Sequence, residues 1–192
     1  MQAGLSLTAD TWYRVFLIMN PSTGAVDAGF DTSSTAANLI ADAAGYTLYR
    51  RISWALTNSS SNIINWDHSG SSKHYAWDLM TVQLASAGST SGANIAVQVP
   101  PSQEGVIMAQ NYITTAVTNY FLLTQTDQAN STPSSVFQTV RGQNDAGFLA
   151  ATNTNTINIK VNADSQIRQR TNETASFVYV STVGWIDDPE QP

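Results

Sequence analysis

The chain has 192 residues and a formal net charge of −6, and only 11% of its residues are charged, well below the roughly 25% of ordinary soluble domains. This balance excludes nucleic-acid binding, which needs basic surfaces that release counterions, and it disfavours attachment to anionic lipid. Ser, Thr, Asn and Gln supply the polarity instead. Such a surface suits neutral, hydroxyl-rich ligands such as glycans, another protein surface, or burial within an assembly.

The sequence contains no cysteine, so it has neither a disulfide framework nor a thiolate metal site. Its apolar runs are shorter than the about 20 residues that span a membrane, and no membrane insertion is expected. The first residues, MQAGLSLTADTW, lack the basic and apolar regions of a secretory signal peptide. An extracellular location is therefore expected to depend on release with a larger particle.

Short β-branched and aromatic runs separated by turn residues fill most of the chain, which is typical of a sandwich or barrel. The first turn is NPSTG (20–24), where Pro and Gly suit the central turn positions. One stretch alone has helical composition, STAANLIADAAG (34–45), and it predicts a single short helix. The predicted strands are residues 12–19, 25–30, 47–57, 62–67, 74–81, 94–98, 105–114, 119–126, 135–141, 147–152, 156–161, 166–170 and 175–185.

Two late segments have informative patterns. In 156–162, Ile157, Ile159 and Val161 alternate with polar residues, which predicts a strand with one buried and one wet face. The run 176–183 is more uniformly apolar, which predicts a strand inside a sheet.

Polar and small residues mark the breaks between these runs. The NTN stretch at 153–155 predicts a polar reversal, and 85–92 has the composition of a flexible loop. Composition is alike on both sides of that loop. The prediction is therefore a single β-sandwich domain over residues 1–192, with a possible subregion break near 86–92.

The tightest polar and aromatic cluster lies between residues 66 and 78. One interpretation is a glycan platform, in which rings stack on a sugar and a carboxylate holds its hydroxyls. The alternative is that the rings pack beneath a hairpin as part of the core. The candidate ligand-binding residues are Trp66, Asp67, His68, His74, Tyr75 and Trp77.

Metal and cofactor binding are not expected from this cluster. Asp67, His68, His74 and Asp78 have the chemistry of zinc ligands, but their spacing matches no familiar metal motif. The sequence also lacks a phosphate loop and a dinucleotide fingerprint. No metal site and no cofactor are therefore assigned.

Catalytic equipment is sparse. Both histidines fall in one hairpin and no G-x-S-x-G motif occurs, which argues against a serine hydrolase. Glycoside hydrolysis uses two carboxylates, and nothing in the sequence brings two together. The available acids are Asp67, Asp78, Glu104, Asp127 and Asp145. We assign no catalytic residue and predict that the chain is not an enzyme.

Arginines occur inside two apolar strands. Arg14 lies in TWYRVF, and Arg50 and Arg51 lie in YTLYRRISWAL. Their aliphatic stems can cover aromatic rings, or a guanidinium can grip a carboxylate from a neighbouring chain or an acidic sugar.

Residues 10–64 resemble a module that is common near the C-termini of bacteriophage and prophage tail-fibre proteins. The matching features are TWY (11–13), NPSTG (20–24), Asp27, FD (30–31), GYT (45–47), YRRI (49–52) and II (63–64), with GWID (184–187) similar to the end of such modules. The family usually has Gly after its Arg-Arg-Ile, where this chain has Ser53. Residues 66–183 resemble no family residue by residue.

The resemblance implies an all-β fold, an antiparallel jelly-roll-like sandwich with at most one short helix, on a virion fibre or spike. Head spikes of phage-like gene-transfer particles are a neighbouring case. Related domains form trimers and bind host-surface glycans. The expected partners are therefore a host-surface glycan, other virion or particle proteins and further copies of the chain in a homo-oligomer (trimer), and the expected location is a virion or phage-like particle, extracellular after release.

Non-covalent recognition of host polysaccharide is the function that these features predict. Candidate binding loops are 66–77, 86–92 and 126–135, since loops on a stable scaffold commonly carry recognition. The alternatives are an architectural trimerisation, adaptor or decoration domain without its own ligand, and a glycan-cleaving enzyme.

Overall fold

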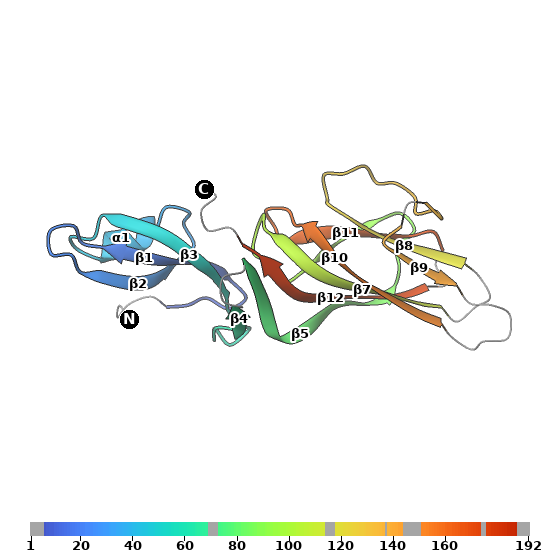
Figure 1. The fold of residues 1–192 in the computed structure, drawn as a ribbon, viewed down its shortest axis with the longest axis horizontal. Coiled ribbons are helices and arrows are strands. Elements are labelled where there is room, and N and C mark those ends of the chain that lie inside the picture. The colour runs from blue at the N-terminus through green and yellow to red at the C-terminus, as the bar shows by residue number, and fades with distance from the viewer. Residues whose placement is uncertain are drawn as a thin grey trace. The chain divides into compact units, whose positions relative to one another are not determined.

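The computed structural model describes residues 6–68, 73–113, 118–136, 138–143, 151–173 and 176–187. In this part of the chain, twelve strands form three antiparallel sheets, and there is one short helix (Figure 1). The predicted all-β, antiparallel class with at most one short helix is confirmed. No helix among the described residues has the length and apolarity needed to cross a membrane.

The chain divides into two compact units. Residues up to Asn65 form the first, and Trp66–Asp187 form the second. The division differs from the expected single domain with a break near 86–92, because that segment lies inside the second unit. There a Cβ built on Gly88 would lie 2.2 Å from the Thr171 side chain, so the segment packs closely against its own unit.

The first unit is built on a three-stranded sheet. Its strands are β1 (Trp12–Met19), β2 (Val26–Asp31) and β3 (Leu48–Leu56), in the order β2-β1-β3. The Oδ1 atom of Asn20 accepts hydrogen bonds from the backbone N–H groups of Ser22 (3.0 Å) and Thr23 (3.3 Å), which closes the predicted NPSTG turn between β1 and β2. Gly24 has a φ of 69°, a conformation that favours glycine.

The only helix of this unit within the described residues is α1 (Ala37–Asp42), shorter than the predicted 34–45. Its N-cap residue, Ala36, offers no capping side chain. Asp31 at the end of β2 replaces the cap, because its Oδ2 accepts a hydrogen bond from the backbone N–H of Leu39 at 2.9 Å. Its Oδ1 accepts from Ser33 N–H and from Asn38 Nδ2, both at 2.8 Å. One buried carboxylate therefore fixes the helix to the sheet.

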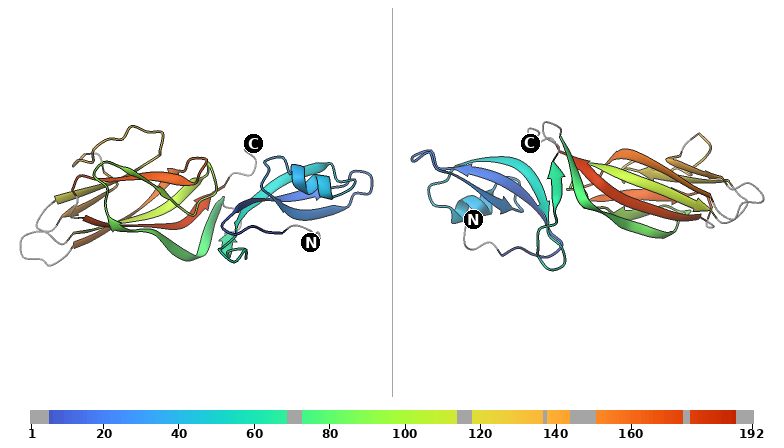
Figure 2. Two further views of the ribbon diagram at one scale, coloured as in Figure 1. Left: turned by 180° about the vertical axis from the view of Figure 1, so that it is seen from behind. Right: turned by 60° about the horizontal axis from the view of Figure 1, so that its bottom comes forward.

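The helix covers one face of the β2-β1-β3 sheet (Figure 2). Phe16 and Ile18 of β1 pack with Leu39 of α1 in a buried cluster. Gly29 of β2 lies opposite Phe16, and a Cβ at this position would lie 2.5 Å from Leu39 Cδ1. The glycine thus allows the helix to approach the sheet closely.

Two of the three arginines of this unit lie against an aromatic ring, through the guanidinium group and not through the expected aliphatic stem. The Arg14 guanidinium lies 4.6 Å from the ring centroid of Trp54, and that of Arg51 lies 5.5 Å from the same ring. Arg14 also donates a hydrogen bond to the carbonyl of Thr32 at 2.7 Å. Both guanidinium groups therefore lie over one aromatic ring of the same unit, in cation–π contact.

The second unit contains the remaining strands. They are β4 (Trp66–His68), β5 (His74–Ala87), β6 (Ala93–Ala96), β7 (Glu104–Ile113), β8 (Thr118–Thr124), β9 (Val140–Gln143), β10 (Ala151–Lys160), β11 (Gln166–Thr171) and β12 (Ser176–Ile186). They form two sheets, ordered β10-β7-β12-β5-β4 and β6-β11-β8-β9 (Figure 1). Strands β5, β7, β10 and β12 lie in one sheet, and β6, β8, β9 and β11 lie in the other. This strand order is that of a jelly roll. The predicted sandwich therefore describes the second unit, whereas the first is a helix-covered sheet.

The core of the second unit lies between these two sheets. Strand β12 is central, since it pairs with both β5 and β7, which confirms the prediction for the apolar run 176–183. Its Val178 and Val180 are fully buried, as are Phe121 and Ile167 from the facing sheet. The alternation predicted in 156–162 is also confirmed, because Ile159 is buried and Lys160 is exposed.

Several predicted boundaries were wrong. Residues 153–155 do not reverse the chain but lie within β10, where Asn153 pairs with Asn111. Since β10 is an edge strand with an exposed face, its Asn and Thr side chains remain in water, and polarity there does not mark a turn. Strand β5 is longer than predicted and takes up part of the expected 85–92 loop. Residues 147–150 of the predicted strand 147–152 lie outside the described residues.

Removal of the Asp31 carboxylate is expected to destabilise the first unit. Burial raises the pKa of Asp31, but the hydrogen bonds from Leu39, Ser33 and Asn38 outweigh it, so the folded-state pKa is lowered. Asp31→Ala should cost about 2 kcal/mol at neutral pH. A carboxyl with a lowered folded pKa contributes stability above its unfolded pKa of about 3.9 and loses it as the pH falls through the folded value.

The difference between the native chain and Asp31→Ala should therefore be largest at pH 7 and narrow from about pH 4 downward. Hydrogen exchange of residues 31–45 along a urea series measures it. Asp27→Ala is the matched control, because Asp27 is exposed and, within the described ranges, its carboxylate accepts one hydrogen bond, from the neighbouring Ala28 N–H at 2.8 Å. A difference that stays constant from pH 7 to pH 2.5 would contradict the assignment.

Candidate functional site

The predicted aromatic cluster forms where β4 joins the edge of β5 in the second unit. Trp66 pairs with Trp77, and His68 pairs with Tyr75. Residues directly opposite each other on paired strands share a face, so these four rings gather on one side of the sheet. Strand β12 adds a fifth ring, Trp185, which pairs with Tyr75.

The rings pack tightly around Trp185. Tyr75 stacks on it at 5.1 Å between centroids with 7° between the planes, and Trp77 lies at 4.8 Å. Trp66 meets both Tyr75 (5.3 Å) and Trp185 (6.1 Å) edge to face. His68 stacks on Tyr75 at 4.6 Å. Such contacts contribute about 0.5–1.5 kcal/mol per pair beyond the burial of their area.

Burial separates the candidate residues into two groups. Trp185, Tyr75 and Trp77 expose 0%, 7% and 5% of their surface, and the Trp77 Nε1–H donates to the carbonyl of Gln98 at 2.9 Å. The Tyr75 and Trp77 rings therefore belong to the core, as the alternative interpretation had it, and they present no free face to a sugar.

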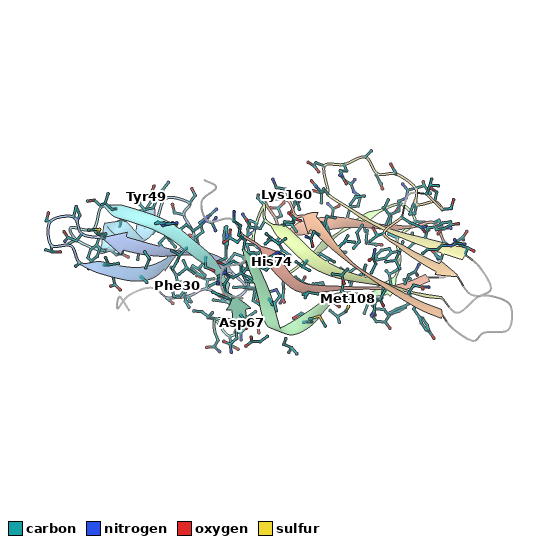
Figure 3. The ribbon with its side chains drawn as sticks, viewed as in Figure 1. Phe30, Tyr49, Asp67, His74, Met108 and Lys160 are labelled. Atoms are coloured by element: carbon teal, nitrogen blue, oxygen red, sulfur yellow. The ribbon has the colours of Figure 1, made fainter. Side chains whose placement is uncertain are left out.

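The rest of the predicted set remains accessible. Trp66 is partly buried, while Asp67, His68 and His74 are exposed; Figure 3 labels Asp67 and His74 on β4 and β5. Asp67 Oδ1 accepts a hydrogen bond from the His68 backbone N–H at 2.8 Å. Within the described ranges, no three His, Asp or Glu side chains gather closely enough to hold a metal ion.

Sequence reasoning did not include Trp185 in this cluster. A hundred residues separate it from β5, and the only local signal was the GWID stretch. The neighbouring Gly184 shows how closely the strands approach, because a Cβ there would lie 2.0 Å from the carbonyl oxygen of Tyr75. The β12 backbone can reach this position only with glycine.

A separate polar cleft of about 240 Å³ opens where three connections of the second unit meet. It is formed by the segment before β7, the segment after β8 and the end of β10, where Figure 3 labels Lys160. It includes the start of the predicted binding loop 126–135. The lining residues are Ser102, Gln125, Thr126, Asp127, Lys160, Val161 and Asn162.

Backbone hydrogen bonds hold two of these connections together. Ser102 N–H donates to the carbonyl of Asn162 at 3.1 Å, and Val161 N–H donates to that of Gln103 at 3.0 Å. The Asn162 Oδ1 in turn accepts from Gln166 N–H at 2.8 Å and closes the turn between β10 and β11. Ser102 has a φ of 63°, an uncommon conformation for a residue with a side chain.

Strand β11 holds the third connection with an arginine. One Arg168 guanidinium nitrogen donates to the carbonyl of Gln128 at 2.6 Å, and another donates to that of Thr126. The turn is also closed from within, since Gln128 N–H donates to the carbonyl of Gln125 at 3.3 Å. A planar guanidinium that binds two carbonyls fixes the orientation of the loop. Asp127, between the two carbonyls, is therefore held at the cleft.

Two charged side chains, Asp127 and Lys160, line the cleft. In the part of the chain that the structure describes, neither the Asp127 carboxylate nor the Lys160 ammonium makes a hydrogen bond or an ion pair. They reach the cleft from different connections, and Glu104 is the cross-strand neighbour of Lys160. With Gln125 and Ser102, the cleft offers a charged acceptor, a charged donor, an amide and a hydroxyl. This combination can bind a ligand rich in hydroxyl groups.

Comparison with known protein families finds none that matches the chain, and comparison with curated proteins finds no related sequence. The tail-fibre resemblance therefore stays a prediction from the sequence. The segment that carries it, residues 10–64, coincides with the first compact unit, which ends at Asn65. The GWID stretch, in contrast, lies in the second unit, from β12 to Asp187.

Loss of the central ring should unfold the cluster. Trp185→Ala is expected to destabilise the second unit by about 3–5 kcal/mol, because it removes a fully buried large side chain. Urea unfolding followed by hydrogen exchange of β5 and β12 measures the change. His68→Ala, which removes an exposed ring from the same stack, should cost less than about 1 kcal/mol. Equal effects of the two variants would show that Trp185 is not central.

Arg168 is expected to be a positioning residue for the cleft. Arg168→Gln removes the guanidinium that holds residues 126–128, so amide exchange in 125–128 should rise about tenfold or more while the strands keep their protection. Arg170→Gln is the matched control, because Arg170 ties Asn130 and Thr90 through their carbonyls, at 2.6 and 2.8 Å, and does not contact residues 125–128. Unchanged exchange in Arg168→Gln would contradict this role.

Proposed function

We propose that this chain is a fibre or spike domain of a virion or phage-like particle that recognises host-surface polysaccharide by non-covalent binding in the cleft of its jelly-roll unit. The observation that carries the proposal is the pair of charges that line the cleft, Asp127 and Lys160, with the connection that carries Asp127 held in place by Arg168. The tail-fibre resemblance of residues 10–64 supplies the particle context.

The cleft chemistry supports a sugar ligand. A carboxylate accepts hydrogen bonds from neighbouring hydroxyls, an ammonium donates to hydroxyl or ring oxygens, and an amide does both. Charged partners strengthen each such bond. A volume of about 240 Å³ is below the about 300–1,000 Å³ of pockets for drug-sized molecules. It suits one sugar unit of a longer chain.

Charge and multiplicity fit this ligand class. With a net charge of −6, the chain creates little attraction for an acidic polymer, so a neutral glycan is the better partner. One small cleft binds weakly, and several copies on one particle would raise the effective concentration of sites. Recognition by repeated, individually weak contacts is thus consistent with a fibre or spike.

The architectural alternative is favoured by a different observation. The first unit leaves an apolar sheet face exposed, with Val26 and Leu48 among its residues, which is a property of assembly domains. An architectural domain would need no ligand in the cleft. A test of glycan binding in the cleft therefore distinguishes glycan recognition from the architectural function.

The glycan-cleaving alternative has no matching observation. Glycoside hydrolysis uses two carboxylates about 5–9.5 Å apart, and among the described residues Asp127 is the one acid that lines the cleft. Glu104 is the cross-strand neighbour of Lys160 but does not line the cleft. Asp67 and Asp78 lie in the separate β4–β5 region, and Asp145 is outside the described residues. We therefore propose binding without cleavage.

Removal of either cleft charge should weaken binding. Asp127→Asn and Lys160→Gln are each expected to reduce glycan affinity about tenfold or more, because a hydrogen bond to a charged group contributes about 1.5–3 kcal/mol. Binding of a multimerised chain to a glycan array, and to capsule-bearing against capsule-less host cells, measures the effect. Asp164→Asn removes the same charge from an exposed turn beside the cleft, and it should bind as the native chain does.

Three results would overturn the proposal. Equal binding to both kinds of cell, with no glycan retained on the array, would leave the architectural function. Glycan binding that survives both cleft substitutions but is lost in His68→Ala or Asp67→Asn would move the site to the exposed side of the β4–β5 region. Release of reducing ends from the bound polysaccharide would revive the enzyme.

A further inference from the structure

Two asparagines are completely buried in the core of the second unit. Asn111 of β7 and Asn119 of β8 each expose 0% of their surface. Among the described residues, neither the Oδ1 nor the Nδ2 atom of either side chain has a hydrogen-bond partner, and the Oγ1 atom of the fully buried Thr171 on β11 has none either. Native proteins pair the large majority of their buried polar atoms, so these five atoms require a partner of another kind.

The three side chains lie at the same end of the sandwich. Thr171 pairs with the buried Phe121 of β8, and Asn119 is two residues before Phe121, so both point to the inner face of their sheet. Asn111 pairs with the buried Val178 of β12 and points inward from the other sheet. Strands β7 and β8 contact each other although they belong to different sheets. Asn111 is near the end of β7 and Asn119 is near the start of β8, so the polar atoms of both sheets lie in one region of the core.

The surroundings of these side chains are apolar. The inward-facing residues that precede Asn111 in β7 are Ile107 and Ala109, and both are fully buried, as are Val178 and Phe121. Backbone groups of β7 cannot serve the asparagine, because this strand is paired on both sides, with β10 and β12. An unpaired polar atom is costly in such low-dielectric surroundings.

We propose that Asn111, Asn119 and Thr171 form a buried hydration site, in which at least one ordered water molecule bridges the two sheets of the jelly-roll unit. Two amides and a hydroxyl offer both donors and acceptors, and a buried water typically makes about three hydrogen bonds to polar groups that lack other partners. Globular proteins hold about one buried water per 27 residues, so a unit of this size is expected to contain several. The bridge connects β7 with β8 and β11, which belong to different sheets.

Charge favours water over an ion as the occupant. The three side chains are neutral, and an ion in an apolar core without an opposite charge is far more costly to bury than a water molecule. Arg168 and Arg170 of β11 alternate with the buried residues of that strand and bind loop carbonyls. They therefore lie on the face opposite to Thr171 and supply no charge to the site.

NMR spectroscopy of the full, isotope-labelled chain tests the site. The side-chain NH2 groups of Asn111 and Asn119 should both show contacts to water, with NOE and ROE signals of opposite sign, which is the signature of long-lived, buried water. Asn158 is exposed on β10 and provides the internal control. Its side-chain NH2 group should show only the signals of short-lived surface water.

Two reciprocal variants show whether the asparagines share the water. Asn119→Leu keeps the branched shape of the side chain and removes its polar atoms, so the water contact of the Asn111 amide should be lost. Asn111→Leu should in the same way remove the water contact of the Asn119 amide. If one variant does not fold, the other variant and the spectrum of the native chain still decide the proposal.

Thr182→Val is the matched control for these variants. Thr182 of β12 is also fully buried, but its hydroxyl is satisfied within the protein. Its Oγ1 donates to Gln83 Oε1 at 2.9 Å and accepts from the backbone N–H of Gln98 at 3.2 Å. Loss of this hydroxyl should leave the water contacts of both asparagines unchanged.

Four results would overturn the proposal. The first is the absence of long-lived water contacts at both asparagines of the native chain, and the second is a contact between the two amides without water, which would show a direct hydrogen bond. The third is a water contact of Asn111 that Asn119→Leu leaves intact. The fourth is displacement of the water contacts by one particular salt at constant ionic strength, which would assign the site to an ion. None of these results involves the cleft, so the inference stands or fails separately from the proposed function.

Discussion

Strand β12 is the element on which the jelly-roll unit depends, because it pairs along its length with β5 on one side and β7 on the other. This pairing brings together segments that are a hundred residues apart in the chain, and it places Trp185 against Tyr75 and Trp77. The sheet cannot be complete until the end of the unit has been added. Folds dominated by such distant pairings pay the entropy of loop closure before they gain contacts, and they fold slowly for that reason.

The same constraint separates structural residues from those available for recognition. The rings where the end of β12 pairs with the start of β5 are buried in the core, so they cannot also bind a ligand. The loop after β8 that lines the cleft contributes little to the core, and it is held in place because Arg168 and Arg170 bind its backbone carbonyls. Preorganised loops lose less entropy on binding. The proposed function therefore rests on charged and amide groups at the rim and not on stacked rings.

The first unit solves a different problem. Its sheet is too small to form a core alone, and Asp31 recruits a single short helix to cover one face. The other face is left apolar.

The sequence alone determined the local structure well. Strand β1 has the predicted bounds, and most other strands begin and end within a few residues of their predicted bounds. The alternation of Ile157 and Ile159 with polar residues also gave the faces of β10 correctly. Both succeed because the side-chain period and the turn chemistry are local properties of the sequence. Only the tertiary structure decided that the chain forms two units, that Tyr75 and Trp77 are buried under Trp185, and that Asp127 and Lys160 share a cleft. These facts depend on which distant strands become neighbours, and a pattern read along one strand carries no information about its partners across a sheet or between sheets.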